Sequence, residues 1–71
     1  MYANLYIAMK TRKPRVTQKN IANEIGITPR QAFNKINNGK FYDDEALKIQ
    51  GKYFPDYDLK ELFKKVWNDK D

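Results

Sequence analysis

The sequence predicts an all-helical fold, a compact bundle of about five short helices, and three observations lead to this prediction. Apolar residues recur three and four positions apart in several segments, which is the spacing of a helix face. No segment has the sustained alternation of apolar and polar residues that is typical of a half-buried strand. Residues that start and stop helices divide the 71-residue chain into short pieces. We therefore expect a single domain over residues 1–71.

The first helix is predicted from residue 3 to about residue 12. Its apolar face consists of Leu5, Ala8 and Met9. Pro14 follows shortly after, and a proline disfavours a helical conformation in the residue before it, so the helix is expected to end at the sequence Arg12-Lys13-Pro14.

The second and third helices are expected to be separated by a very short turn. Thr17 is the predicted cap of a helix over residues 18–25, with Val16 packing as a hydrophobic staple against Ile21. Gly26 is expected to end this helix in a left-handed conformation. Ile27 then turns inward, Thr28 caps the third helix and Pro29 takes its first position. The third helix is expected to reach Asn38-Gly39, with Gly39 as a second left-handed stop.

Two further helices complete the predicted bundle. The fourth begins at three consecutive acids, which complement the positive end of a helix dipole, and extends to Phe54-Pro55. The fifth is predicted over residues 59–67, with Asp58 as its cap. Its apolar stripe consists of Leu59, Leu62, Phe63 and Val66.

Two short helices joined by a turn with one glycine and one inward apolar residue form a helix-turn-helix unit. The small side chain of Ala22 is expected to let the third helix approach the second closely. Around this unit, over roughly residues 4 to 55, the sequence resembles the lambda-repressor-like helix-turn-helix domains of phage repressors and bacterial regulators. The matching residues are Thr17-Gln18, Ala22, Gly26-Ile27-Thr28-Pro29, Ala32, Ile36 and Asn38-Gly39-Lys40-Phe41, followed by the acidic helix start DDEALKI.

The resemblance implies that the third predicted helix enters the major groove of DNA and reads base edges. The base-reading candidates are Thr28, Arg30, Gln31, Phe33, Asn34 and Asn37. Arg30 suits guanine, and Gln31 or Asn34 suits adenine. Phe33 has two interpretations, a thymine-methyl contact or an aromatic that packs inside the protein, and of these we favour packing. A solvated helix start is the alternative for Arg30 and Gln31.

The predicted phosphate contacts lie around that helix. They are Gln18, Lys19, Arg12, Lys13, Arg15, Asn38 and Lys40. Gln18 and Lys19 open the second helix, where side chains and backbone N–H groups meet phosphates readily. The three basic residues of the preceding link have no geometry for reading bases, and their alternative role is that of an ordinary charged loop.

The charge of the chain is unevenly distributed. Residues 1–42 carry eight basic residues and one acid, a balance of +7, whereas residues 43–71 carry six lysines and eight acids, a balance of −2. A basic half attracts polyanions such as nucleic acid, although it also serves solubility. With neither cysteine nor histidine, no nucleophile-base pair and no phosphate-binding glycine loop, the chain is not expected to be an enzyme or to bind a cofactor, metal or small-molecule substrate.

We therefore expect a sequence-specific regulator that binds double-stranded DNA, such as a small phage-type repressor that acts by occluding an operator. The alternative is a protein–protein interaction module, an inhibitor or adaptor of phage origin, on the same fold. Residues 58–71 are expected to form a helix and tail that mediate homodimerisation through Phe63, Val66 and Trp67, because tryptophan is enriched where partners meet. No membrane span or signal peptide is predicted, so a cytoplasmic location is expected.

Overall fold

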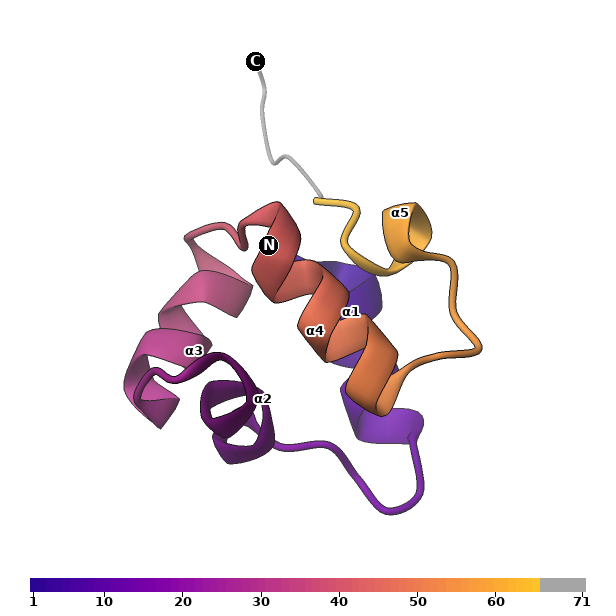
Figure 1. Ribbon diagram of the computed structural model, residues 1–71, viewed down its shortest axis with the longest axis horizontal. Coiled ribbons are helices and arrows are strands. Elements are labelled where there is room, and N and C mark those ends of the chain that lie inside the picture. Colours follow the sequence, from indigo (N-terminus) through magenta and orange to yellow (C-terminus); the bar gives the residue numbers. More distant parts are fainter. Residues whose placement is uncertain (66–71) are drawn as a thin grey trace.

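The computed structural model describes residues 1–65, and this part of the chain is all-helical, as predicted. The helices are α1 (Ala3–Thr11), α2 (Gln18–Ile25), α3 (Pro29–Asn37), α4 (Asp43–Tyr53) and α5 (Leu59–Leu62). They pack into one compact globule in which α2 and α3 lie against each other, α4 contacts α2, and α4 passes in front of α1 in the view of Figure 1. Residues 66–71, which include two of the predicted dimer contacts, Val66 and Trp67, lie outside the described residues.

The beginnings of α2 and α3 are fixed by the same device. The Thr17 hydroxyl accepts a hydrogen bond from the Asn20 backbone N–H at 3.1 Å, and the Asn20 side chain accepts one from the Thr17 N–H at 2.9 Å. Thr28 and Gln31 exchange the same two bonds at 3.1 and 3.0 Å. Each pair satisfies two backbone donors that a helix start otherwise leaves without partners. Both helices therefore start where the threonines predicted.

The turn between α2 and α3 is as tight as expected. Gly26 is left-handed, with φ 74°, and its N–H donates to the Ala22 carbonyl. The Ile27 N–H donates to the same carbonyl at 2.9 Å, and its side chain packs against the core. Ala22 is fully buried, and α2 and α3 lie in close contact.

The prediction of a second left-handed glycine at Gly39 is wrong. Within residues 1–65, Gly26 is the one glycine with a positive φ. Instead, the N–H groups of Asn38 and Gly39 both donate to the Asn34 carbonyl at 2.8 Å, which ends α3 without a left-handed residue. A Cβ at Gly39 would lie 3.2 Å from the Lys35 Cα, so a glycine is favoured here by close approach rather than by its φ.

The core is formed by side chains from all five helices and the links between them. Its largest fully buried members are Phe54, Leu5, Ile21, Ile36, Ile49 and Leu62. Tyr2 joins the amino-terminal end of the chain to α3 and to the link after it, because its N–H donates to the Ile36 carbonyl and its hydroxyl accepts from the Phe41 N–H at 2.8 Å. The apolar stripe of each helix faces this one core.

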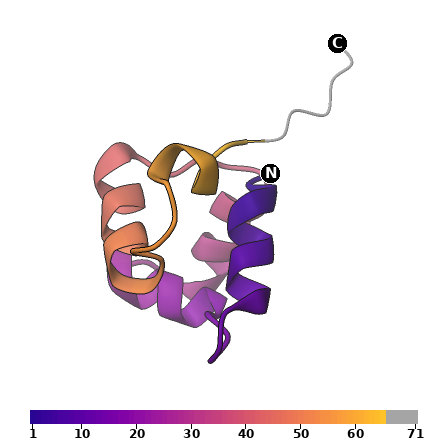
Figure 2. The ribbon, with the colours of Figure 1, turned by 90° about the vertical axis from the view of Figure 1, so that its right-hand side faces the viewer.

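The fifth helix is shorter than predicted. It covers Leu59–Leu62 rather than residues 59–67, and it lies across α1 and α4 (Figure 2). Phe63 follows it and turns toward the core, where its ring meets Tyr2 at 5.8 Å and Phe41 at 5.5 Å between centroids. Phe63 is therefore partly buried within its own chain, and its part in a dimer contact stays a prediction.

Candidate nucleic-acid interface

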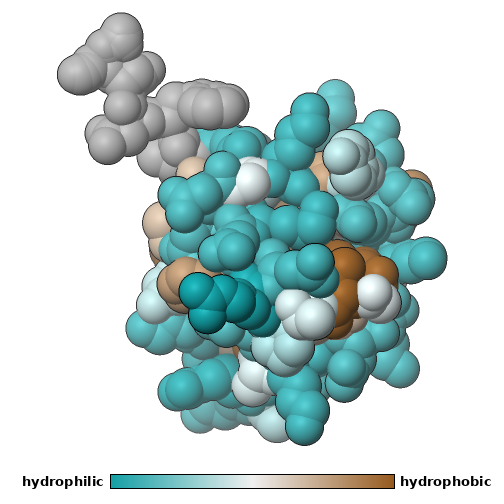
Figure 3. All heavy atoms as spheres, turned by 90° about the vertical axis from the view of Figure 1, so that its left-hand side faces the viewer, coloured by the Kyte–Doolittle hydropathy of each residue, from teal (hydrophilic) through white to brown (hydrophobic). Residues whose placement is uncertain are grey.

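The outward face of α3 is polar apart from one aromatic ring. Ala32 and Ile36 point into the core and are buried, while Arg30 and Asn34 are exposed. Phe33 is 46% exposed, so it projects away from the core, and the inward role favoured for it from the sequence is wrong. The small Ala32 occupies the inward position instead. The view onto this side of the molecule shows a mainly hydrophilic surface with separate apolar spots (Figure 3).

The other base-reading candidates are partly committed to α3 itself. The Gln31 side-chain oxygen accepts from the Thr28 N–H, and the Thr28 hydroxyl accepts from the Gln31 N–H. The Asn37 side chain is half-buried and donates to the Phe33 carbonyl at 2.9 Å. These three side chains fix the ends of the helix, which leaves Arg30, Phe33 and Asn34 as the outward members of the predicted reading set.

Three adjoining hollows connect α3 to the start of α2 and to α1, and Gln18 lines all three. The first is lined by Gln18, Arg30, Phe33 and Asn34. The second extends from Phe33 and Asn37 to Met1, Tyr6 and Met9. The third is lined by Tyr6, Met9, Lys10, Arg15, Val16, Thr17, Gln18, Lys19 and Pro29. The outward face of α3 is therefore continuous with a basic surface formed by α1, α2 and the link between them.

Most of the predicted phosphate-contacting side chains are accessible. Those that are exposed are Gln18, Lys19, Lys13, Arg15, Asn38 and Lys40. Of these, Gln18, Lys19 and Arg15 share the third hollow. Asn38 and Lys40 follow the carboxyl end of α3, and Lys13 lies in the link between α1 and α2.

Arg12 is the exception, because its side chain has partners within the protein, and its role as a phosphate anchor stays a prediction. Its Nη2 donates to Asp56 Oδ1 at 2.7 Å, and its guanidinium lies 5.1 Å from the ring centroid of Phe54 and 5.2 Å from that of Tyr57. The hydrogen bond from Arg12 holds the pKa of the Asp56 carboxyl below its ordinary value of 3.8. Arg12 therefore joins the end of α1 to the link between α4 and α5.

Two residues of this surface, Tyr6 and Lys10 of α1, were not predicted from the sequence. Both are exposed, and the Lys10 Nζ lies 5.1 Å from the centroid of the Tyr6 ring. Their spacing of four residues places them on one helix face, away from the buried Leu5 and Met9. The sequence feature that could have indicated them is a tyrosine one helical turn before a lysine, outside the predicted apolar face of the first helix.

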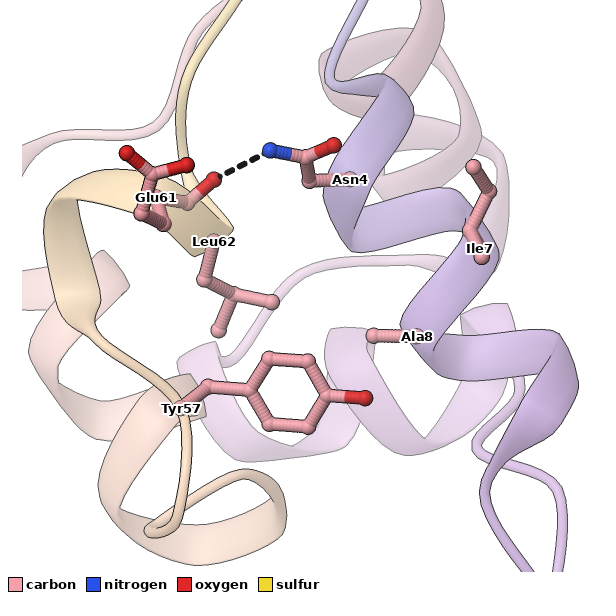
Figure 4. A pocket seen from close by; sticks show the side chains of 6 residues that line it. All are labelled: Asn4, Ile7, Ala8, Tyr57, Glu61 and Leu62. Carbon is pink, nitrogen blue, oxygen red and sulfur yellow. Dashed lines mark hydrogen bonds between the residues drawn. The ribbon is translucent and has the colours of Figure 1, made fainter.

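A separate hollow between α1 and α5 has a different character. It is lined by Asn4, Ile7, Ala8, Tyr57, Glu61 and Leu62 (Figure 4). The Asn4 side chain donates to the Glu61 carbonyl at 2.7 Å across it, which joins the two helices. The hollow contains one carboxylate and no basic side chain among the described residues, so it is not part of the basic surface.

No protein-family model matches the chain, and neither the search of curated proteins nor that of solved structures found a significant match. Within residues 1–65, no helix has the length and apolar character needed to cross a membrane, and no group of three or more side chains is arranged to hold a metal ion. The description of the fold therefore depends on the structure alone, which is all-helical within residues 1–65 and has α2 and α3 as a close pair joined by a glycine turn.

Proposed function

We propose that the protein is a sequence-specific regulator that binds double-stranded DNA through α3. The observation that carries this proposal is the outward stripe of α3, in which Arg30, Phe33 and Asn34 are all exposed while Ala32 and Ile36 secure the helix to the core. The major groove admits an α-helix, and bases are read there by guanidinium, amide and apolar groups. The stripe offers one of each.

The spacing of the stripe matches the spacing of base pairs. Arg30 and Asn34 are four residues apart, so they lie on one side of α3 and about 6 Å apart along its axis. That separation is close to twice the ~3.4 Å between successive bases of a strand. Arg30 would donate both N–H groups of its fork to guanine, and Asn34 would pair with adenine about two base pairs away. Phe33, between them, would contact a thymine methyl.

The proposed mechanism is operator occlusion, with no covalent chemistry. One helix-turn-helix unit contacts few base pairs, so we propose that two copies bind paired half-sites about one helical turn apart. A bound pair would block polymerase, as a small phage-type repressor does. For this mechanism the protein needs only to occupy the operator, and no catalytic group is required.

One observation favours the second candidate function, a protein–protein interaction module. Phe33 at 46%, Tyr6 at 41% and Met1 at 39% exposure are unusually accessible for large apolar side chains, and they border one hollow. Exposed aromatic residues that lie together are typical of surfaces that bind a partner protein. The polar residues of α3 and the surrounding lysines and arginines favour DNA over this alternative, because charged residues are depleted in the core of protein interfaces.

Selection of bound sequences from random duplex DNA tests the proposal. We expect the unaltered protein to enrich a short consensus, and Arg30→Ala to lose its preference at one base pair, worth roughly 1 to 3 kcal/mol. Lys48→Ala is the matched control, since Lys48 is an exposed cation on α4 that lines none of the three hollows. Enrichment of no sequence by the unaltered protein would contradict the proposed function and favour the interaction module.

A further inference from the structure

The third hollow gathers basic side chains from three parts of the chain. Lys10 comes from α1, Arg15 from the link and Lys19 from the first turn of α2. No carboxylate among residues 1–65 lines this hollow. Three like charges around one concave surface repel one another in the free protein, and an anion that enters the hollow relieves that repulsion.

These cations differ from the basic residues that have a structural role. Arg12 is paired with Asp56, and Lys35 with Glu45 at 3.3 Å. In the described residues, Lys10, Arg15 and Lys19 form no ion pair. Their positive charge is therefore available to a partner.

Lys10 is also held in place. Its ammonium lies over the Tyr6 ring, and Tyr6 itself lines the hollow. A cation–π contact of this kind restricts the rotamers of the lysine, which lowers the entropy lost when the ammonium binds an anion. The Tyr6 hydroxyl adds a neutral hydrogen-bond donor at the same rim.

The position of α1 connects this hollow to the reading helix. The Met9 carbonyl accepts from the Val16 N–H at 3.1 Å, which sets the end of α1 beside the start of α2. At its other end, α1 is joined to α3 through the Tyr2 N–H and the Ile36 carbonyl at 3.0 Å. α1 therefore borders the second and third hollows, and both adjoin at Gln18 the hollow that carries Arg30 and Asn34.

We propose that α1 is a third DNA-contacting element, and that Lys10, together with Arg15 and Lys19, binds phosphates of the strand that flanks the groove occupied by α3. This inference rests on the proposed function, and it adds Lys10 of α1 to the phosphate contacts that the sequence predicted at Arg15 and Lys19. The contacts would be independent of base sequence, because phosphates carry no sequence information.

The test is the salt dependence of binding to a short duplex of arbitrary sequence, measured from about 50 to 200 mM salt. We compare the unaltered protein with Lys10→Ala and with the control Lys48→Ala, which removes the same charge from α4. For each phosphate that is no longer neutralised, the slope of log K against log salt decreases in magnitude by about 0.9. We expect that decrease for Lys10→Ala, with equal weakening on all sequences, and no decrease for Lys48→Ala.

Two other results would overturn the inference in distinguishable ways. If Lys10→Ala and Lys48→Ala have the same slope as the unaltered protein, while Arg30→Ala still alters base preference, the assignment of α1 fails and the proposed function stands. If the unaltered protein has no salt-dependent affinity for duplex DNA, the proposed function and this inference fail together. Thermal melting of the Lys10 variant verifies that its fold is retained.

Discussion

Gly26 fixes the angle at which α3 leaves α2. Its φ of 74° lies in the left-handed region, which side chains with a Cβ resist. A Cβ placed there would meet nothing within 4 Å, so space does not forbid a larger residue. Glycine is therefore favoured at this position by its backbone conformation alone. A substitution by alanine measures the free energy of that conformation without an added steric clash.

We predict that Gly26→Ala lowers the free energy of unfolding by roughly 1 to 2 kcal/mol, the difference between left-handed and right-handed backbone for a residue with a side chain. Gly51→Ala is the matched control, since Gly51 lies within α4 and a Cβ there also meets nothing within 4 Å. In a helix interior the same change is expected to stabilise by roughly 0.5 to 1 kcal/mol. Urea denaturation of both variants measures the two changes in the free energy of unfolding, which are expected to have opposite signs. A loss of stability in both variants would contradict this account of Gly26.

Ala32 and Phe33 mark a limit of prediction at the level of single residues. Both are apolar neighbours in α3, and a small rotation of the helix exchanges which of them faces inward. In the structure Ala32 takes the inward position and is fully buried, in a helix that packs closely against α2. Because the rotation of α3 is set by its packing against the rest of the protein, the sequence left both interpretations of Phe33 open.

Helix boundaries with a clear capping or stop residue were predictable from the sequence, whereas the carboxyl end of α5, which has none, was not. Thr17, Gly26 and Thr28 gave the bounds of α2 and the start of α3, because each residue satisfies or ends a helix locally. The reciprocal bonds of Asn20 and Gln31 were not foreseen, although threonine followed three residues later by an amide was visible. Gln31 is thus a cap as well as a neighbour of the reading set.

The end of α5 depends on tertiary contacts instead. The apolar period of the sequence continues beyond Leu62, which predicted a helix to residue 67. In the structure Phe63 leaves the helix to pack against Tyr2 and Phe41, and the Lys65 Nζ donates to the Gly39 carbonyl at 2.7 Å. Contacts with residues far away in sequence therefore set this boundary, and a local period does not reveal them.

We predict that Phe63→Ala lowers the free energy of unfolding by roughly 1 to 3 kcal/mol, less than for a fully buried ring because Phe63 is only partly covered. The midpoint of thermal unfolding should be independent of protein concentration in both proteins, since the ring packs within one chain. Leu47→Ala, at a 55% exposed apolar position on α4, is the control and should change stability by no more than about 0.5 kcal/mol. A concentration-dependent midpoint that Phe63→Ala abolishes would instead favour the original dimer assignment.

The uneven charge of the whole molecule is partly compensated by the fold. Two of the basic residues in the first half of the chain are paired with acids from the second half, Arg12 with Asp56 and Lys35 with Glu45. The cations around α1, α2 and α3 are left without such pairs in the described residues, and they border the continuous hollows beside the reading helix. The fold thus concentrates the excess positive charge on the face that we propose for DNA.

The pair formed by Arg12 and Asp56 also predicts how stability depends on pH. The hydrogen bond from Arg12 lowers the Asp56 pKa in the folded state below the ordinary 3.8, so the unfolded chain binds this proton more readily. The contribution of Asp56 to stability is therefore fully present above that ordinary value and is lost as the pH falls through the lowered pKa. Asp56→Asn should be less stable than the unaltered protein near neutral pH.

The two proteins should converge in stability once the pH lies well below 3.8. The difference between their thermal midpoints isolates Asp56, because the remaining carboxyl groups titrate in both. Asp56 is largely exposed, so the difference should be small and should also shrink as salt is added at neutral pH. A difference that persisted unchanged into acid would mean that Asp56 acts through something other than its carboxylate charge. No difference at neutral pH would mean that Arg12 is held by its contacts with the Phe54 and Tyr57 rings alone.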